Sequence, residues 1–237
     1  MKDVRLNKYI AECGICSRRE ADKLIEAGQI EVNGVTAVQG LKIGPEDEVK
    51  YKGRVIRPVE KKTILAYYKP VGVTCTEKDE HAEVTLSDVI DYPVRLTYAG
   101  RLDKDSEGLL LLTNDGDLIE ELMRGANEHE KEYTVRTDRP LDKEAVKKME
   151  KGIYLKELDV TTRPCKIKIT GDMEFDIILT QGLNRQIRRM CEAAGYRVEA
   201  LKRIRVANIT LGDLKSGEYR ELTDRESDEL YAIAKKN

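Results

Sequence analysis

Four consecutive leucines, Leu109 to Leu112, constrain the fold of this chain more than any other feature of its sequence. Gly108 and Thr113 bracket them, and an apolar run of this length between such residues predicts a fully buried strand. A turn follows at residues 114–116. After it we expect a helix capped by Asp117, with Glu120 three residues later to complete a capping box. The region around residue 110 therefore belongs to the core of a domain.

Strand and helix patterns alternate through the rest of this region without a regular rhythm. Strands are expected over residues 63–68, 132–137, 166–170, 174–180 and 206–211, and helices over 142–151, 184–194 and 224–235. Because the helices are interspersed irregularly, the pattern favours an α+β domain over a doubly wound sheet.

A smaller module precedes that domain. Residues 5–14 predict a helix, and a capping box at Ser17-Arg-Arg-Glu20 begins a second helix that ends at Gly28. Asn33-Gly34 is a typical hairpin turn, since both residues tolerate a positive φ, and a further strand pair is expected around residues 52–53. A short charged link over residues 59–62 ends the module. We predict two domains, residues 1–60 and 61–237, which suits a length of 237 residues.

Composition excludes several classes of protein. Mean hydropathy is −0.54, and no apolar run approaches the ~20 residues of a membrane-spanning helix. The N-terminus has no apolar segment typical of a secretory signal, so we expect a cytoplasmic protein. Five cysteines, an odd number spread along the chain, are expected as free thiols. The two histidines, His81 and His129, have no neighbouring ligand residues at metal-binding spacing, so no metal site is expected.

The net charge of only −2 indicates no global basic field. The distribution of charge along the chain is more informative than its sum. Residues 181–205 carry seven Lys and Arg against two Glu, which predicts a local cationic patch. Arg18 and Arg19 lie in the first turn of the second predicted helix, where the helix dipole disfavours cations. A solvated face and a binding surface for a phosphate backbone are both consistent with these two arginines.

The stretch from Gly100 to Gly108 is where chemistry is most plausible. It predicts a loop that leads into the buried strand, and such a loop can hold a carboxylate at the mouth of a core. An aspartate there, paired with an arginine, suits a nucleophile or a base. The residues alone do not distinguish Asp103 from Asp105, or either from an ordinary acidic loop.

Two resemblances extend these inferences. Residues 4–56 resemble the S4 RNA-binding domain, through Arg5-Leu-Asn-Lys-Tyr-Ile, Ser17-Arg-Arg-Glu-Ala-Asp, Gly28 and Val32-Asn-Gly34. Residues 100–116 resemble the catalytic motif of pseudouridine synthases that carry an N-terminal S4 domain. Three more blocks agree in order and spacing: Tyr68-Lys-Pro-Val-Gly72, Lys131-Glu-Tyr-Thr-Val135 and residues 181–191. The runs 127–133 and 184–188 look closest to the large-subunit rRNA synthase F type.

The resemblance implies a fold and a set of site residues. It implies a small αα-β-hairpin S4 domain followed by an α+β catalytic domain with a bent, mostly antiparallel mixed sheet. Asp103 corresponds to the essential aspartate, Tyr133 to the active-site tyrosine that stacks on the uracil, and Arg188 to the arginine that pairs with the aspartate. Lys69 is expected to support the active-site wall and Leu201 to line the pocket. The residues expected to contact RNA are Lys8, Arg18, Arg19, Lys23, Arg101, Arg185 and Arg203.

The implied reaction is the isomerisation of a uridine within structured RNA, which needs no cofactor and no metal. Asp103 would begin it by attack at C1′ or C6, or by removing a proton from C2′, and the sequence does not choose among these. The implied substrate is 23S rRNA, free or in an assembly intermediate, or also a tRNA anticodon loop. A monomer without membrane association is expected.

Two other classes of function share some of these features. A non-catalytic S4-type RNA-binding or ribosome-assembly protein would explain Arg18 and Arg19, but not the joint presence of Asp103, Tyr133 and Arg188. A glycoside or nucleoside hydrolase would normally need a second catalytic carboxylate.

Overall fold

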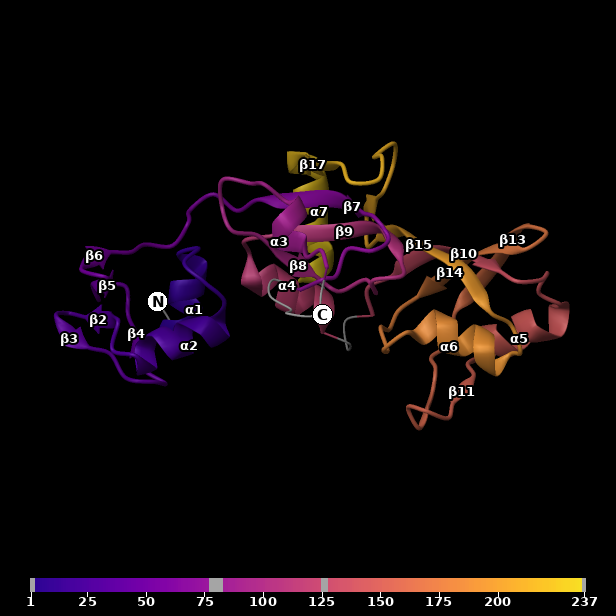
Figure 1. The fold of residues 1–237 in the computed structure, drawn as a ribbon, viewed down its shortest axis with the longest axis horizontal. Coiled ribbons are helices and arrows are strands. Elements are labelled where there is room, and N and C mark those ends of the chain that lie inside the picture. The colour runs from indigo at the N-terminus through magenta and orange to yellow at the C-terminus, as the bar shows by residue number, and fades with distance from the viewer. Residues whose placement is uncertain (1–2, 77–82, 125–127, 236–237) are drawn as a thin grey trace. The chain divides into compact units, whose positions relative to one another are not determined.

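The computed structural model describes residues 3–76, 83–124 and 128–235 (Figure 1). His81 and Asn127, on which part of the sequence analysis depends, lie outside these ranges. The chain divides into two compact units. The small unit comprises residues 1–63, 92–97 and 113–116, and the large unit comprises residues 64–91, 98–112 and 117–237. In the described part of the chain, no helix is both long and apolar enough to cross a membrane.

The small unit is built as its sequence predicts. Helices α1 (Leu6–Glu12) and α2 (Arg18–Glu26) precede a four-stranded antiparallel sheet of order β3-β2-β5-β6. Its strands are β2 (Ile30–Val32), β3 (Val35–Thr36), β5 (Val49–Tyr51) and β6 (Arg54–Val55), and β1 (Val4–Arg5) pairs separately with β4 (Lys42–Ile43). Both hydrogen bonds of the Ser17 capping box are present at α2. Leu6, Ile10, Ile25 and Ile30 form the centre of the apolar core.

The large unit is organised around one nine-stranded sheet. Seven strands follow in the order β13-β14-β10-β15-β9-β7-β17, while β16 (Ile209–Thr210) pairs with β15 and β8 (Thr97–Ala99) pairs with β9. The bounds are β7 (Ile64–Lys69), β9 (Glu107–Thr113), β10 (Lys131–Thr137), β13 (Lys166–Gly171), β14 (Glu174–Leu179), β15 (Val198–Val206) and β17 (Tyr219–Glu221). Strands β9 and β15 run parallel, and β10 is antiparallel to both β14 and β15. The predicted α+β class and mostly antiparallel mixed sheet are confirmed.

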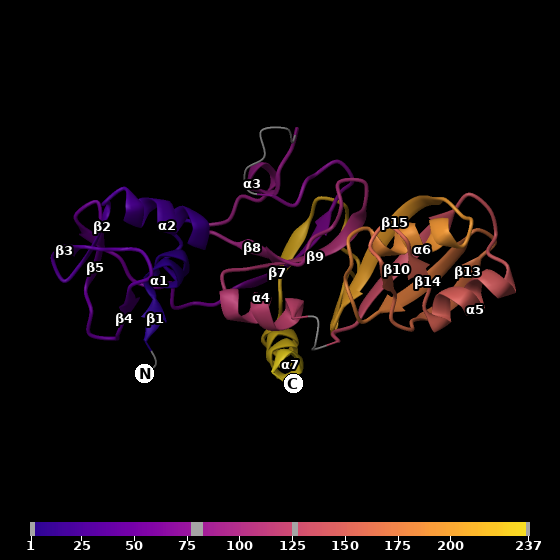
Figure 2. The same cartoon turned by 90° about the horizontal axis from the view of Figure 1, so that it is seen from below.

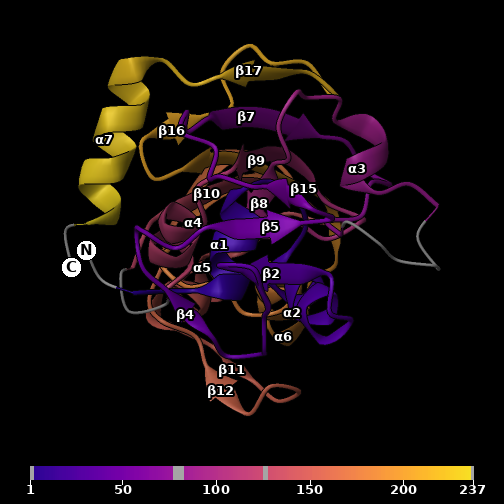
Figure 3. The ribbon, with the colours of Figure 1, turned by 90° about the vertical axis from the view of Figure 1, so that its left-hand side faces the viewer.

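Helices cover this sheet in two groups, each with its own core. Helices α5 (Lys143–Lys151) and α6 (Gln186–Ala193) lie side by side over β10, β14 and β15, as Figures 1 and 2 show. Helices α4 (Gly116–Met123) and α7 (Asp224–Ala234) pack with β7 and β16 around β9, which is the predicted leucine strand. In Figure 3, β17 lies beside β7 at the other edge of the sheet. A short helix α3 (Leu86–Val89) and the hairpin of β11 (Tyr154–Leu155) and β12 (Val160–Thr161) complete the unit.

Two local predictions are wrong. A single strand was expected over residues 206–211, but β15 ends at Val206 and a turn with Ala207 at φ +51° separates it from β16. The sequence pattern missed β15 itself, because its burial does not follow a simple alternation. Asp117 was expected to cap α4, but it lies within the first turn of that helix, which begins at Gly116.

Candidate active site

A cavity of about 310 Å³ opens in the large unit where the loop before β9 faces β10, β15 and the start of α6. Its volume falls at the small end of the range of small-molecule sites, ~300–1,000 Å³. The residues that line it are Gly100 to Asp103, Ser106, Leu122 to Arg124, His129, Lys131, Tyr133, Leu179 to Ile187, Leu201 and Arg203. These residues come from segments more than 100 positions apart in the sequence, and they make this cavity the candidate site.

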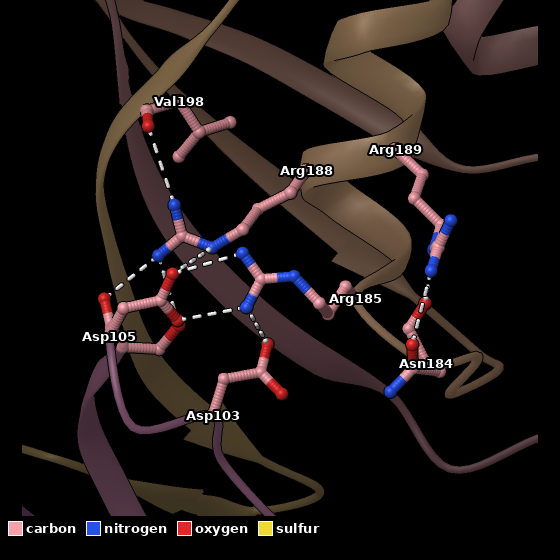
Figure 4. Close-up of polar contacts among 8 residues, drawn as sticks. Asp103, Asp105, Asn184, Arg185, Arg188, Arg189 and Val198 are labelled. Atoms are coloured by element: carbon pink, nitrogen blue, oxygen red, sulfur yellow. Dashed lines mark hydrogen bonds and ion pairs between the residues drawn. The ribbon is translucent and has the colours of Figure 1, made fainter.

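Asp103 lies in the loop that joins β8 to β9, and its side chain is 33% exposed. The loop is braced by backbone hydrogen bonds, because Ser106 N–H donates to the Asp103 carbonyl at 3.1 Å and Gly72 N–H donates to the Lys104 carbonyl at 2.8 Å. Arg185 Nη1 lies 3.7 Å from Asp103 Oδ2 (Figure 4). The carboxylate is thus held beside a cation while it stays open to the cavity.

Asp105 binds two arginines. Arg185 is the N-cap residue of α6, and Arg188 lies within that helix. Arg185 donates two hydrogen bonds to the Asp105 carboxylate, at 3.2 and 3.0 Å, and Arg188 Nε lies 3.3 Å from Asp105 Oδ2 (Figure 4). Burial alone would raise the pKa of Asp105, but the hydrogen bonds from Arg185 and the charges of both arginines outweigh it and lower that pKa. Arg185 has φ +51°, a conformation that L-residues rarely adopt, and it is held there at the N-terminus of α6 beside the cavity.

Arg188 does not occupy the position expected from the sequence. It was predicted to pair with Asp103, but its guanidinium contacts Asp105 and Ser106 and donates to the carbonyl oxygens of Asp105 at 2.8 Å and Val198 at 3.3 Å. The sequence could not separate the two arginines, since positions 185 and 188 lie one turn apart on α6. Arg185 is the residue that pairs with Asp103, and Arg188 ties the loop to β15.

Gly108 begins the buried part of β9 and brings this strand very close to β15. Its φ is +107°, and an added Cβ would lie 2.3 Å from the Arg203 carbonyl oxygen and 2.7 Å from the Arg203 nitrogen. Gly108 and Arg203 are register partners in the parallel β9–β15 pair. Only a residue without a side chain allows this approach, which positions the loop carrying Asp103 over the sheet.

Strand alternation places Tyr133 on the cavity side of β10, and Leu201 and Arg203 on the cavity side of β15. Tyr133 and Arg203 are register partners across the two strands. Arg203 was expected to contact RNA, and it is 1% exposed and donates to the Leu109 carbonyl at 2.7 Å, so it does not lie on an open surface. Arg203 forms part of the cavity floor instead.

The predicted cationic patch over residues 181–205 also does not form as one surface. Arg205 binds Glu132 at 2.7 Å and Glu130 at 2.9 Å, and Lys202 lies over the Tyr68 ring. Arg188 and Arg203 donate hydrogen bonds to backbone carbonyl groups. Most basic residues of this segment therefore stabilise the fold. Arg101 and Arg185 remain exposed at the cavity.

Lys69 is fully buried below the site and does not line the cavity. Its ammonium donates to the carbonyl oxygens of Pro70 at 2.8 Å and Val73 at 2.9 Å, which fixes the turn after β7. Burial lowers the pKa of Lys69, and the charges of Asp103 and Asp105 act in the opposite direction.

His129 and Lys131 also line the cavity, and the sequence analysis gave neither of them a role. The signal for Lys131 was available, since it shares the face of β10 with Tyr133 two residues away. His129 is 7% exposed and its Nε2 atom has no hydrogen-bond partner among the described residues.

The basic residues expected to contact RNA in the small unit lie on its two helices. Arg18, Arg19 and Lys23 are exposed on α2. Lys8 on α1 is half-buried and lies 3.7 Å from Glu12 in an ion pair. Within the described ranges, no group of three or more His, Cys, Asp or Glu residues could hold a metal ion.

Comparison with known proteins gives a consistent result for both parts of the chain. The model of the RNA pseudouridylate synthase family matches residues 63–193, and the model of the S4 domain matches residues 4–49. The dual-specificity RNA pseudouridine synthase RluF of Escherichia coli (strain K12) is 45% identical over 97% of this chain and 79% of its own length. Ribosomal large subunit pseudouridine synthase B of Bacillus subtilis (strain 168) is 37% identical over 97% of this chain and 96% of its own. A crystal structure of a pseudouridylate synthase superposes with a TM-score of 0.71 at 31% identity, over 96% of this chain and 99% of the other.

Proposed function

Because the chain belongs to the RNA pseudouridine synthases that carry an N-terminal S4 domain, we propose that it isomerises a specific uridine of structured RNA with Asp103 as its catalytic aspartate. In this reaction the N1–C1′ bond breaks, the uracil turns, and a C5–C1′ bond forms while C5 loses a proton and N1 gains one. The sum of atoms is unchanged, so the enzyme is an isomerase.

One observation carries the assignment of Asp103. Among the described residues that line the cavity, it is the one carboxylate. A hydrolase of glycosidic bonds normally places two carboxyl groups about the scissile bond, ~5–9.5 Å apart. A single carboxylate beside an arginine suits a reaction in which one group begins bond cleavage and water is not a reactant. Asp103 begins it by attack at C1′ or C6, or by removing the C2′ proton.

The neighbouring side chains have separate roles in this proposal. Tyr133 stacks on the uracil that has left the RNA helix, and its phenol helps to remove the C5 proton directly or through water. Arg185 lies beside the Asp103 carboxylate and orients it, which the 3.7 Å separation supports. Arg188 and Asp105 hold the loop, and Arg101 binds a phosphate beside the extruded nucleotide.

The substrate we propose is 23S rRNA or an assembly intermediate of it, with a tRNA anticodon loop as a second target. Support comes from the relatives, one described as dual-specificity and one as a ribosomal large subunit enzyme. Residues 1–60 bind RNA phosphates through Lys8, Arg18, Arg19 and Lys23, and residues 61–237 perform the chemistry. The enzyme works as a monomer in the cytoplasm, where its substrates are found.

The test is tritium release from RNA that carries [5-³H]uridine. The wild-type protein should release tritium from transcripts of 23S rRNA segments or of tRNA, because the C5 hydrogen leaves during the reaction. Asp103→Asn should reduce release to background while its affinity for the same RNA stays within about threefold of wild type. Asp213→Asn, the same change at an exposed aspartate, is the matched control and should keep full activity. Equal release by Asp103→Asn and the wild type would refute the proposal.

A further inference from the structure

Lys131 is half-buried and presents its ammonium group to the cavity, and no carboxylate of the described residues neutralises it. It is the first residue of β10 and lines the cavity together with Tyr133, two residues further on the same face of the strand. Its one hydrogen bond to a described residue is long, 3.5 Å from Nζ to the carbonyl oxygen of His129. An ammonium in such a place costs free energy unless an acceptor binds to it.

The acidic residues nearest to Lys131 in the sequence bind a different basic residue. Glu130 and Glu132 flank Lys131, but strand alternation turns both away from the cavity face, and both bind Arg205 at 2.9 and 2.7 Å. The side chain that does lie close to Lys131 is a second cation, Arg203, whose Nη2 atom has no hydrogen-bond partner among the described residues. The floor of the cavity is therefore positive, while Asp103 occupies its loop side.

The titration of Lys131 agrees with this geometry. Burial, together with the nearby charge of Arg203, lowers the pKa of Lys131 to about 8. The ammonium form still predominates at neutral pH, so the group acts there as a cation and a hydrogen-bond donor.

The reaction generates negative charge on the part of the substrate that enters the cavity. Cleavage of the N1–C1′ bond leaves its electron pair on the uracil, where it is delocalised onto O2 and O4. Addition of Asp103 at C6 also moves electron density onto O4. After the uracil has turned, its electron pair forms the C5–C1′ bond, which neutralises the base. The C5 proton then leaves and N1 takes up a proton, which gives neutral pseudouridine. A fixed cation at the floor stabilises the anionic stage in every one of these routes.

From this juxtaposition, and resting on the proposed function, we infer that Lys131 is a further catalytic residue, whose ammonium donates to a uracil carbonyl oxygen and stabilises the uracil anion. Lys131 stays protonated throughout and exchanges no proton with the substrate. Tyr133 then contacts the face of the base and Lys131 its edge.

Single-turnover kinetics with wild-type protein, Lys131→Met and Lys131→Arg test this inference. Lys131→Met should lower the rate constant about 10²-fold or more, as loss of one electrostatic donor does in other enzymes, while RNA affinity changes by less than about threefold. Lys131→Arg keeps the charge and should recover most of the rate. Lys168→Met, the same change at an exposed lysine of β13, should leave the rate unchanged.

A leaving-group experiment separates charge stabilisation from a structural role. Fluorine at C5 stabilises a uracil anion, so RNA with 5-fluorouridine at the target depends less on Lys131. The rate of consumption of 5-fluorouridine should therefore differ less between wild type and Lys131→Met than the rate with uridine does.

Two outcomes would overturn the inference. One is a Lys131→Met rate within threefold of wild type, and the other is an equal deficit with both bases. If the methionine variant does not fold, as judged by circular dichroism, Lys131→Gln replaces it in both measurements. A wild-type protein that itself releases no tritium would refute the proposed function, whereas an active wild type with an equally active Lys131→Met would refute only the role of Lys131.

Discussion

Replacement of Gly108 by alanine should disrupt the junction between the catalytic loop and the sheet. A methyl group at this position would lie 2.3 Å from the carbonyl oxygen of Arg203 and 3.0 Å from its carbonyl carbon. Both are backbone atoms of β15, so no side-chain rotation can relieve the clash. To reach an ordinary contact of 3.4 Å, one strand would have to move by roughly 1 Å, in an interior packed as tightly as an organic crystal.

The cost has two parts. Forcing an alanine to φ +107° costs ~1–3 kcal/mol, and inserting a methyl group into a packed interior costs a further ~1–3 kcal/mol. Their sum of about 2–6 kcal/mol is a large fraction of the ~5–15 kcal/mol by which folded proteins are stable. Because Asp103 lies five residues before Gly108, movement of this strand also displaces the carboxylate, and pseudouridine formation should fall.

Urea-induced unfolding followed by circular dichroism measures the cost. Gly217→Ala is the matched control, since Gly217 lies in the same unit at φ +87° with no atom within 4 Å of an added Cβ. It carries the backbone strain without the clash, so Gly108→Ala should lower the free energy of unfolding by ~1–3 kcal/mol more than Gly217→Ala. Equal losses for the two variants would show that the strands do not approach each other as described.

Three further predictions concern caps, RNA contacts and pH. Ser17→Ala removes the capping box of α2 and should lower the stability of the small unit by about 1 kcal/mol in thermal unfolding; an unchanged melting curve would contradict this. Joint replacement of Arg18 and Arg19 by alanine should weaken RNA binding and reduce the slope of log affinity against log salt by about one per lost phosphate contact. An unchanged slope would remove both residues from the interface. Hydrogen bonds from Arg220 lower the pKa of Glu226 from 4.5 to about 2, so the pair stabilises the fold above pH ~4.5 and this contribution is lost as pH falls toward 2. Glu226→Gln should be less stable than wild type at pH 7 but equally stable near pH 2.

Local sequence signals predicted the elements with strong patterns. The capping box at Ser17, the helices expected over residues 142–151 and 224–235 and the leucine strand are confirmed, because each depends on residues a few positions apart. Strand β15 was missed because its residues contact β10 on one side and β9 on the other, and only the assembled sheet determines which of them are buried. The family resemblance supplied the sheet arrangement that periodicity alone could not.

The candidate site, like the fold, was predicted only in part. The family resemblance pointed to Asp103, Tyr133 and Leu201, which line one cavity, but it did not give the correct arginine partner of Asp103. The pairing of Arg185 with Asp103 depends on how α6 meets the loop, and the burial of Arg203 depends on the β9–β15 register. Both depend on tertiary packing, which a count of charged residues does not reveal.

Pseudouridine mapping in cells tests the central claim most directly. RNA from cells lacking this gene, complemented with wild type or with Asp103→Asn, would be treated with carbodiimide and read by primer extension across rRNA and tRNA. The account predicts that a pseudouridine is lost in the deletion and restored by the wild type alone. Restoration by Asp103→Asn would contradict the catalytic role of this carboxylate, and an unchanged set of pseudouridines in the deletion would contradict the proposed substrates.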